Sequence, residues 1–330
     1  MTALDQAGPA LSAGPAPARN GRTSARARAR NRKWVEISLF AGPAALVYIV
    51  FVLLPVALAA FYSFFNWNGL GPLDRFIGLD NYVRLLTDPV FHRSVGNNFF
   101  IVVMSLIVQG PLAILVALLM NRRLRFRGLL RALIFVPYVL SEVTAGLAWQ
   151  IMLQSVPPTR YGPVDTWLRM IGVENPPAWL ADQSVVMWTM FGILTWKYLG
   201  LAIILMLAGL TSVPEELYEA AALDGASWWK TQWYVTVPLL GPTIRIWAFL
   251  SIIGSLQLFD MVWIVTGGGP LNSSSTMAVY MVKNGLNVSQ IGYGSAVAVV
   301  LFLISLVIAL FYQRFALNRD LAGAITTGVR

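Results

Sequence analysis

The chain contains no cysteine and only one histidine in 330 residues. A disulfide framework, a thiolate metal site and a cysteine nucleophile are therefore excluded. The histidine, His92, falls in a polar stretch between two apolar runs, and a single loop histidine lacks the partner ligands that a metal site needs. Charge is scarce as well, at 12% of residues against roughly 25% in a soluble domain. We therefore expect no metal, no cofactor and no catalytic residues.

Apolar residues make up 57% of the chain. A transmembrane helix needs about 20 mainly apolar residues, and six stretches meet that length: 38–65, 98–120, 129–153, 185–209, 239–265 and 292–315. The polar intervals between them are too short for an added soluble domain, and the prolines in 154–184 predict an irregular loop there. The sequence predicts an all-α fold, a polytopic membrane helical bundle with six transmembrane helices, in one domain over 34–320.

Most of the 24 basic residues fall in the segments that precede span one, join spans two and three, and follow span six. Basic loops face the cytoplasm, so both termini are expected to be cytoplasmic. Residues 1–33 read as a disordered basic tail drawn to anionic membrane lipid rather than to nucleic acid, and 321–330 as a second cytoplasmic tail. The loop at 211–238, which falls on the same side, is acidic instead.

That acidic loop carries helix signals. Ser212 with Glu215 predicts a capping box at a helix start, and Asp224-Gly225 offers the left-handed residue that ends a helix. Trp228 opens a second short helix, and Pro238 marks the entry to span five. The pattern predicts a small helix–turn–helix on the cytoplasmic face, whose alanine run lets another protein's backbone approach closely.

The same loop resembles the signature loop of ABC importer permeases. The matching pattern is Glu219-Ala220-Ala221, three residues, Gly225, nine residues, then Val235-x-Val237-Pro238. The resemblance implies that Glu219, Ala220, Ala221, Asp224, Gly225 and Pro238 form a coupling loop that docks on a separate ATPase subunit. None of the four lysines has the glycines of a phosphate loop before it, so the chain is expected to be a permease subunit and not an enzyme.

Further pieces along the chain are similar to the maltose-type carbohydrate-uptake permeases. They are Phe76 to Tyr82, Pro137 with Ser141, Leu207 to Leu210 and Thr266 to Pro270, whereas Asn97-Asn98 departs from the Asn-Thr that this family commonly has before span two. This resemblance implies a sugar substrate, a second homologous permease subunit, an ABC ATPase dimer and an extracytoplasmic solute-binding protein, in the bacterial cytoplasmic (inner) membrane. Permeases for glycerol-phosphate share the pattern, so this solute, or another polar one, remains an alternative.

Several side chains are candidates for the substrate pathway. Glu142 and Lys197 are charges inside predicted spans, where charge is costly unless it is paired or wet. A constant rise along straight spans places them at similar depth, so they can pair or contact water. Near the outer half of span five, the mixture of polar and aromatic groups typical of sugar sites comprises Gln257, Phe259, Asp260 and Trp263.

Three other classes of protein fit less well. Ile291-Gly292-Tyr293-Gly294 resembles a potassium selectivity filter, but it runs directly into the last span without a return segment. An ion-coupled carrier could use Glu142 and Asp260, yet it typically shows two related halves, which are not evident here. A membrane-embedded enzyme would need a catalytic constellation, and only scattered carboxylates are present.

Overall fold

The computed structural model describes residues 39–122, 126–155 and 161–317, so the predicted tails 1–33 and 321–330 lie outside the described residues. The chain divides into two units, 1–58 and 59–330. The described part of the first unit is helical and belongs to the apolar helix Leu39–Tyr62, which contains a wider π-type turn at Ile49–Leu53. The second unit is described below by itself.

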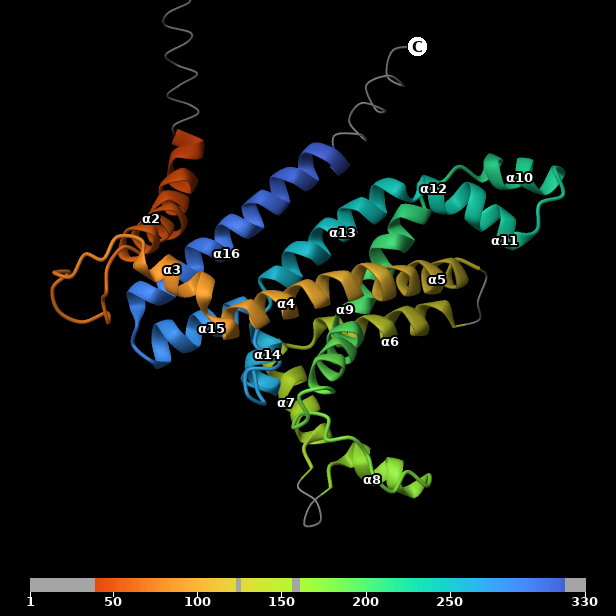
Figure 1. Cartoon of the computed structure of the whole chain (residues 1–330). Coiled ribbons are helices and arrows are strands. Elements are labelled where there is room, and N and C mark those ends of the chain that lie inside the picture. The colour runs from red at the N-terminus through yellow and green to blue at the C-terminus, as the bar shows by residue number, and fades with distance from the viewer. Residues whose placement is uncertain (1–38, 123–125, 156–160, 318–330) are drawn as a thin grey trace, which may run out of the picture. The chain divides into compact units, whose positions relative to one another are not determined.

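Its helices are joined by connections that range from a few residues to the long loops 63–79 and 171–185 (Figure 1). They are α2 (Leu54–Tyr62, shared with the first unit), α3 (Asp80–Thr87), α4 (Pro89–Met104), α5 (Gly110–Met120), α6 (Arg127–Val139), α7 (Glu142–Leu153), α8 (Pro163–Met170), α9 (Val186–Leu210), α10 (Glu215–Leu223), α11 (Trp228–Thr231), α12 (Val237–Leu239), α13 (Gly241–Leu256), α14 (Asp260–Val265), α15 (Met277–Val282) and α16 (Ile291–Tyr312). Within the described ranges there is no β-strand, only one antiparallel bridge between Phe65 and Phe76. The predicted all-α fold is confirmed.

In the part of the chain that the structure describes, four helices are long and apolar enough to cross a membrane without a break: Leu39–Tyr62, Pro89–Met120, Val186–Leu210 and Ile291–Phe315. Two further pairs pass the same test but are bent, α6 with α7 by 93° and the helix ending at Leu239 with α13 by 65°. Counting each bent pair as one span gives up to six spans. The expectation of a straight third span over 129–153 was wrong, because α6 ends at Val139 and α7 starts again in a different direction at Glu142.

The second span begins earlier than predicted. Asp88 caps α4 by accepting hydrogen bonds from the backbone N–H groups of Val90 (2.7 Å) and Phe91 (3.1 Å), and Pro89 occupies the first helical position, where its missing N–H costs nothing. His92, expected in a loop, therefore lies exposed in the first turns of α4.

Helix α9 packs against both α5 and α6, α7 packs against α14, and α4 packs against α13. The α6–α9 contact is close enough that a Cβ on Gly200 would overlap the carbonyl oxygen of Ile134. One apolar cluster joins α4, α7, α9 and α14, and a second joins α5, α9 and α13. The core of the unit is thus built around α9.

Span five is also interrupted, between Leu256 and Asp260. A buried side chain from α4 satisfies the freed backbone groups, because the Asn98 amide donates to the carbonyls of Ser255 (2.6 Å) and Leu256 (3.2 Å) and accepts from the Met277 N–H (2.9 Å). Backbone groups inside a membrane protein need such partners. Asn98 therefore stabilises the break from a different span.

The segment 154–184, predicted to be irregular, contains the short helix α8. Pro163 at its first position and Asp165 in its first turn are ordinary helix-start signals. Asp165 is 3% exposed and accepts a hydrogen bond from the Trp179 indole at 2.8 Å, which ties α8 to the loop that follows it.

Candidate functional site

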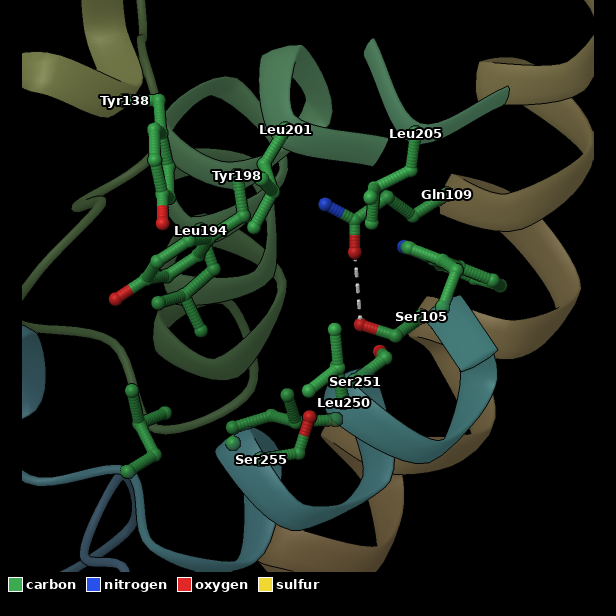
Figure 2. Close-up of a pocket in the computed structure, with 14 residues that line it drawn as sticks. Ser105, Gln109, Tyr138, Leu194, Tyr198, Leu201, Leu205, Leu250, Ser251 and Ser255 are labelled. Atoms are coloured by element: carbon green, nitrogen blue, oxygen red, sulfur yellow. Dashed lines mark hydrogen bonds between the residues drawn. The ribbon is translucent and has the colours of Figure 1, made fainter. Parts of the chain in front are cut away.

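A cavity of about 200 Å³ lies among the spans of the second unit (Figure 2). Its lining comes from α4, α6, α9, α13 and the turns next to them: Ile101, Ser105, Gln109, Tyr138, Leu194, Tyr198, Leu201, Leu205, Trp247, Leu250, Ser251, Gly254, Ser255 and Leu258. None of these described side chains carries a charge. The cavity is therefore an uncharged chamber inside an apolar bundle.

The cavity has two kinds of wall. Figure 2 shows the rings of Tyr138 and Tyr198 on one side, with polar side chains across from them; the ring centroids are 6.4 Å apart. On the polar side, the Ser105 hydroxyl donates to the Gln109 side-chain oxygen at 3.0 Å. Aromatic faces bind the apolar faces of a solute and polar groups bind its hydroxyls, so the chamber suits a neutral solute that has both.

The two intramembrane charges meet at the bend of span three. The Lys197 ammonium lies 3.5 Å from Glu142 Oε1 and donates to the backbone carbonyls of Pro137 (3.1 Å), Tyr138 (3.0 Å) and Leu140. Its side chain is 1% exposed. The structure thus places Lys197 where α6 ends and Glu142 where α7 begins, although span three is bent and not straight as the estimate of their depth assumed.

Neither Glu142 nor Lys197 lines the cavity, nor do the candidates from span five. Gln257 and Asp260 are exposed beside the break in that span, while Phe259 stacks on Trp263 with 5.4 Å between centroids and packs against the cluster around α14. A pathway role for these six residues stays a prediction.

Sequence reasoning missed the residues that do line the cavity. A usable signal was present in two spans, because Ser105 and Gln109 lie four residues apart, as do Ser251 and Ser255. Positions four apart share one face of a helix, so each pair gives an otherwise apolar span a polar stripe.

The loop at 211–238 forms two short helices, α10 and α11, as predicted. The predicted capping box is wrong: the residue before α10 is Pro214, which makes no side-chain cap, and the Ser212 hydroxyl donates instead to the Gly209 carbonyl at 2.7 Å. Proline in the extended conformation already stops α9 from continuing into α10. Ser212 consequently belongs to the end of the preceding helix.

The turn after α10 has the geometry that Asp224-Gly225 predicts. Gly225 has a φ of +70°, its N–H donates to the Ala222 carbonyl (3.0 Å), and the Ala226 N–H reaches back to the Ala221 carbonyl (2.9 Å). This double closure is the Schellman motif, which requires a left-handed residue. A non-glycine residue here would be strained.

This loop presents apolar groups outward. Leu223 is 90% exposed and Tyr234 76%, and Glu219, Ala220, Asp224, Gly225 and Pro238 are exposed too, with Ala221 partly so. The Arg122 guanidinium lies 3.9 Å from the ring centroid of Trp228, a cation–π contact. The loop is thereby attached to the end of α5, at the end of the unit where α6 begins (Figure 1).

The glycine-rich segment after α14 forms a tight turn, with φ of +57° at Gly267 and +82° at Gly268. Lys283 lies against it and donates to the Asn272 side-chain oxygen at 3.2 Å. Partial burial lowers the pKa of this ammonium, since desolvation disfavours the charged form. The lysine supports the turn.

Among the described residues no group of three histidine or acidic side chains could hold a metal ion.

Comparison with known proteins gives consistent matches. The family described as "Binding-protein-dependent transport system inner membrane component" matches residues 109–320. A probable ABC transporter permease of Pyrococcus horikoshii is 32% identical over 84% of this chain and 94% of its own length. The multiple sugar-binding transport system permease MsmF of Streptococcus mutans is 32% identical over 78% of this chain and 87% of its own length.

One solved structure shares the fold, that of a bacterial alginate ABC transporter in complex with an alginate pentasaccharide-bound periplasmic protein. Its matching chain has a TM-score of 0.75 at 22% identity, with 87% of this chain and 95% of that chain covered. The overall fold is therefore a known one, and the chain belongs to the family of binding-protein-dependent transport system inner membrane components, the permease subunits of ABC importers.

Proposed function

We propose that this chain conducts a neutral saccharide across the bacterial cytoplasmic membrane as one permease of an ATP-driven importer. The observation that carries the proposal is the uncharged cavity, with tyrosine rings on one side and hydroxyl and amide groups on the other. The description of MsmF as a multiple sugar-binding system permease and the alginate bound in the related complex support a sugar as the solute class.

The lining argues against glycerol-phosphate as the solute. Phosphate is held by arginine, lysine or clustered backbone N–H donors, and no described residue that lines the cavity is basic. Moving an uncompensated phosphate charge into an apolar bundle is costly. A mono- or oligosaccharide without charge meets no such cost.

The energy and the delivery of solute come from other chains in this proposal. The exposed surface around Leu223 and the loop residues Glu219 and Gly225 fit a cleft in a separate ATPase dimer. A second homologous permease completes the pathway, and a solute-binding protein delivers sugar on the opposite side. Both termini and the loop 211–238 then face the cytoplasm, with residues 34–320 as the transmembrane domain.

The transport test is uptake of radiolabelled glucose, maltose, lactose, raffinose and glycerol-3-phosphate by cells with and without this chain. We expect at least one neutral sugar to enter only when the chain is present, and its uptake to stop when ATP is depleted. Uptake of glycerol-3-phosphate alone, or uptake that follows a proton or sodium gradient without ATP, would contradict the proposal.

The partner test is affinity purification from detergent-solubilised native membranes. The intact chain is compared with Glu219→Ala plus Gly225→Pro, because proline cannot adopt the positive φ of Gly225. An ATPase and a second permease should accompany the intact chain, and the ATPase should be lost from the variant. Met170→Ala, which removes an exposed apolar side chain on α8, is the matched control and should retain both. Recovery of the chain alone would refute this assembly.

A further inference from the structure

The bend in span three is connected to the cavity through two tyrosines. Lys197 contacts the backbone of Tyr138, and Glu142 contacts the side chain of Tyr198, yet only the two tyrosines line the cavity. We propose that Lys197 and Glu142 are positioning residues, which fix the bend and thereby hold the tyrosine wall in the geometry that binds solute. The inference rests on the proposed function and deepens it.

Lys197 completes the end of α6. The last carbonyls of a helix lack intrahelical partners and carry its negative dipole end, and here the lysine ammonium donates to three of them, those of Pro137, Tyr138 and Leu140. With the side chain 1% exposed, water is not a ready substitute. A positive charge at this point therefore stabilises an end of α6 that a continuous helix would not have, and it restrains the backbone that carries the Tyr138 ring.

Glu142 performs the matching role at the start of α7. Ser141 caps this helix by accepting from the Thr144 N–H at 3.1 Å, which leaves the Glu142 side chain to reach α9. One of its oxygens, Oε1, lies 3.5 Å from the Lys197 ammonium and accepts a hydrogen bond from the Tyr198 hydroxyl at 3.1 Å. A single carboxylate oxygen thus joins α7 to two consecutive residues of α9.

The consequence for the cavity is visible in Figure 2, where the Tyr198 hydroxyl points away from Ser105 and Gln109. Because that hydroxyl is held by Glu142, the ring is fixed by its far edge and the ring, not the hydroxyl, forms the wall. Lys197 and Glu142 then act on solute only through the tyrosines. A direct contact between either charge and solute would need one of them to line the cavity, and neither does.

The first test is a double-mutant cycle on sugar uptake, in the assembled importer and with the sugar found in the transport test. Tyr198→Phe keeps the ring and removes its tether, and Glu142→Ala removes the other end of the same hydrogen bond. Each should raise the half-saturation concentration about tenfold, a size typical of coupled neighbouring residues, with the maximal rate changed by less than about twofold. The double variant should be no worse than the larger single effect.

Two further variants separate positioning from direct contact. Glu142→Gln keeps an oxygen that can accept from Tyr198 and should return the half-saturation concentration to within about twofold of the wild type. Thr195→Val, on α9 like Tyr198, removes a buried hydroxyl that has no partner among the described residues, so it should leave uptake unchanged. Effects that multiply to about a hundredfold in the double variant, or no rescue by glutamine, would overturn the proposal.

The second test needs no sugar. The chain has no cysteine, so spin labels can be placed on Leu133→Cys in α6 and Ile151→Cys in α7, both of which are exposed positions. Double electron–electron resonance should give a narrow distance distribution across the bend, broadened by Lys197→Met and unchanged by Tyr198→Phe. If Lys197→Met leaves the distribution narrow, the pair does not fix the bend. This result stands whether or not the wild type imports any sugar, so it separates failure of this inference from failure of the proposed function.

Discussion

Replacing Asn98 by leucine tests how strongly the break in span five depends on one buried side chain. Leucine has a similar size, so little cavity is created, but three hydrogen bonds disappear: those to the carbonyls of Ser255 and Leu256 and that from the Met277 N–H. The Asn98 side chain is fully buried, so all three backbone groups lose their partner together.

The expected decrease in the free energy of unfolding can be estimated in two ways. Hydrogen bonds in a membrane protein average about 0.6 kcal/mol in double-mutant cycles, which gives a lower bound of about 2 kcal/mol for three bonds. Leaving a buried polar group without a partner costs about 1–3 kcal/mol, so three such groups cost about 3 kcal/mol even at the low end of that scale. We expect Asn98→Leu to lower the free energy of unfolding by about 2–5 kcal/mol, measured by steric trapping in bicelles or as a fall in Tm of the detergent-solubilised chain.

The neighbouring residue provides the control. Asn97 also donates to two carbonyls, those of Ser273 and Ser275, both at 2.8 Å, but it is only partly buried. Water can replace its bonds, so Asn97→Leu should cost less than about 1 kcal/mol. Equal losses of unfolding free energy for the two variants, or a loss below about 1 kcal/mol for Asn98→Leu, would refute the argument that burial of the asparagine side chain decides the cost.

Three other outcomes are expected. Thr195→Val removes a buried hydroxyl without a partner among the described residues and should leave Tm unchanged or raise it slightly, since an unsatisfied polar group costs energy; a clear fall in Tm would show that the hydroxyl has a role. Gly200→Ala would bring a Cβ into the Ile134 carbonyl and should lower Tm by several degrees, because α6 and α9 would be forced apart. An unchanged Tm in thermal unfolding would contradict this close contact. Leu223→Ala should weaken co-purification of the ATPase at least about fivefold without altering Tm, because Leu223 is 90% exposed; unchanged recovery would exclude it from the docking surface.

The sequence predicted those features that depend on neighbouring residues. Asp224-Gly225 specified a helix end and the structure has it, with the left-handed φ at Gly225, because a turn of this type is decided within a few residues. Even so, a local signal can be overridden by another signal that lies nearer to the helix end. Pro214 fixed the start of α10 and left Ser212 in the previous turn, so the capping box did not form.

The bend in span three could not be predicted in the same way. Residues 129–153 read as one apolar run, and the side chain that satisfies the freed carbonyls is Lys197, 60 residues from Pro137. The cavity poses the same difficulty, because its walls come from helices that are distant in sequence. Pairs such as Ser251 and Ser255 reveal a polar face, but only packing decides which faces meet.

The two broken spans differ in when their partners are made. The amide that satisfies span five belongs to α4, which precedes it in the chain, whereas the ammonium that satisfies span three belongs to α9, which follows it. During synthesis span three therefore enters the membrane before the group that stabilises its bend exists, and unsatisfied carbonyls are costly there. We therefore expect the bend of span three to be completed only when span four has been inserted, while the carbonyls at the Leu256–Asp260 break of span five meet their partner as soon as they arrive.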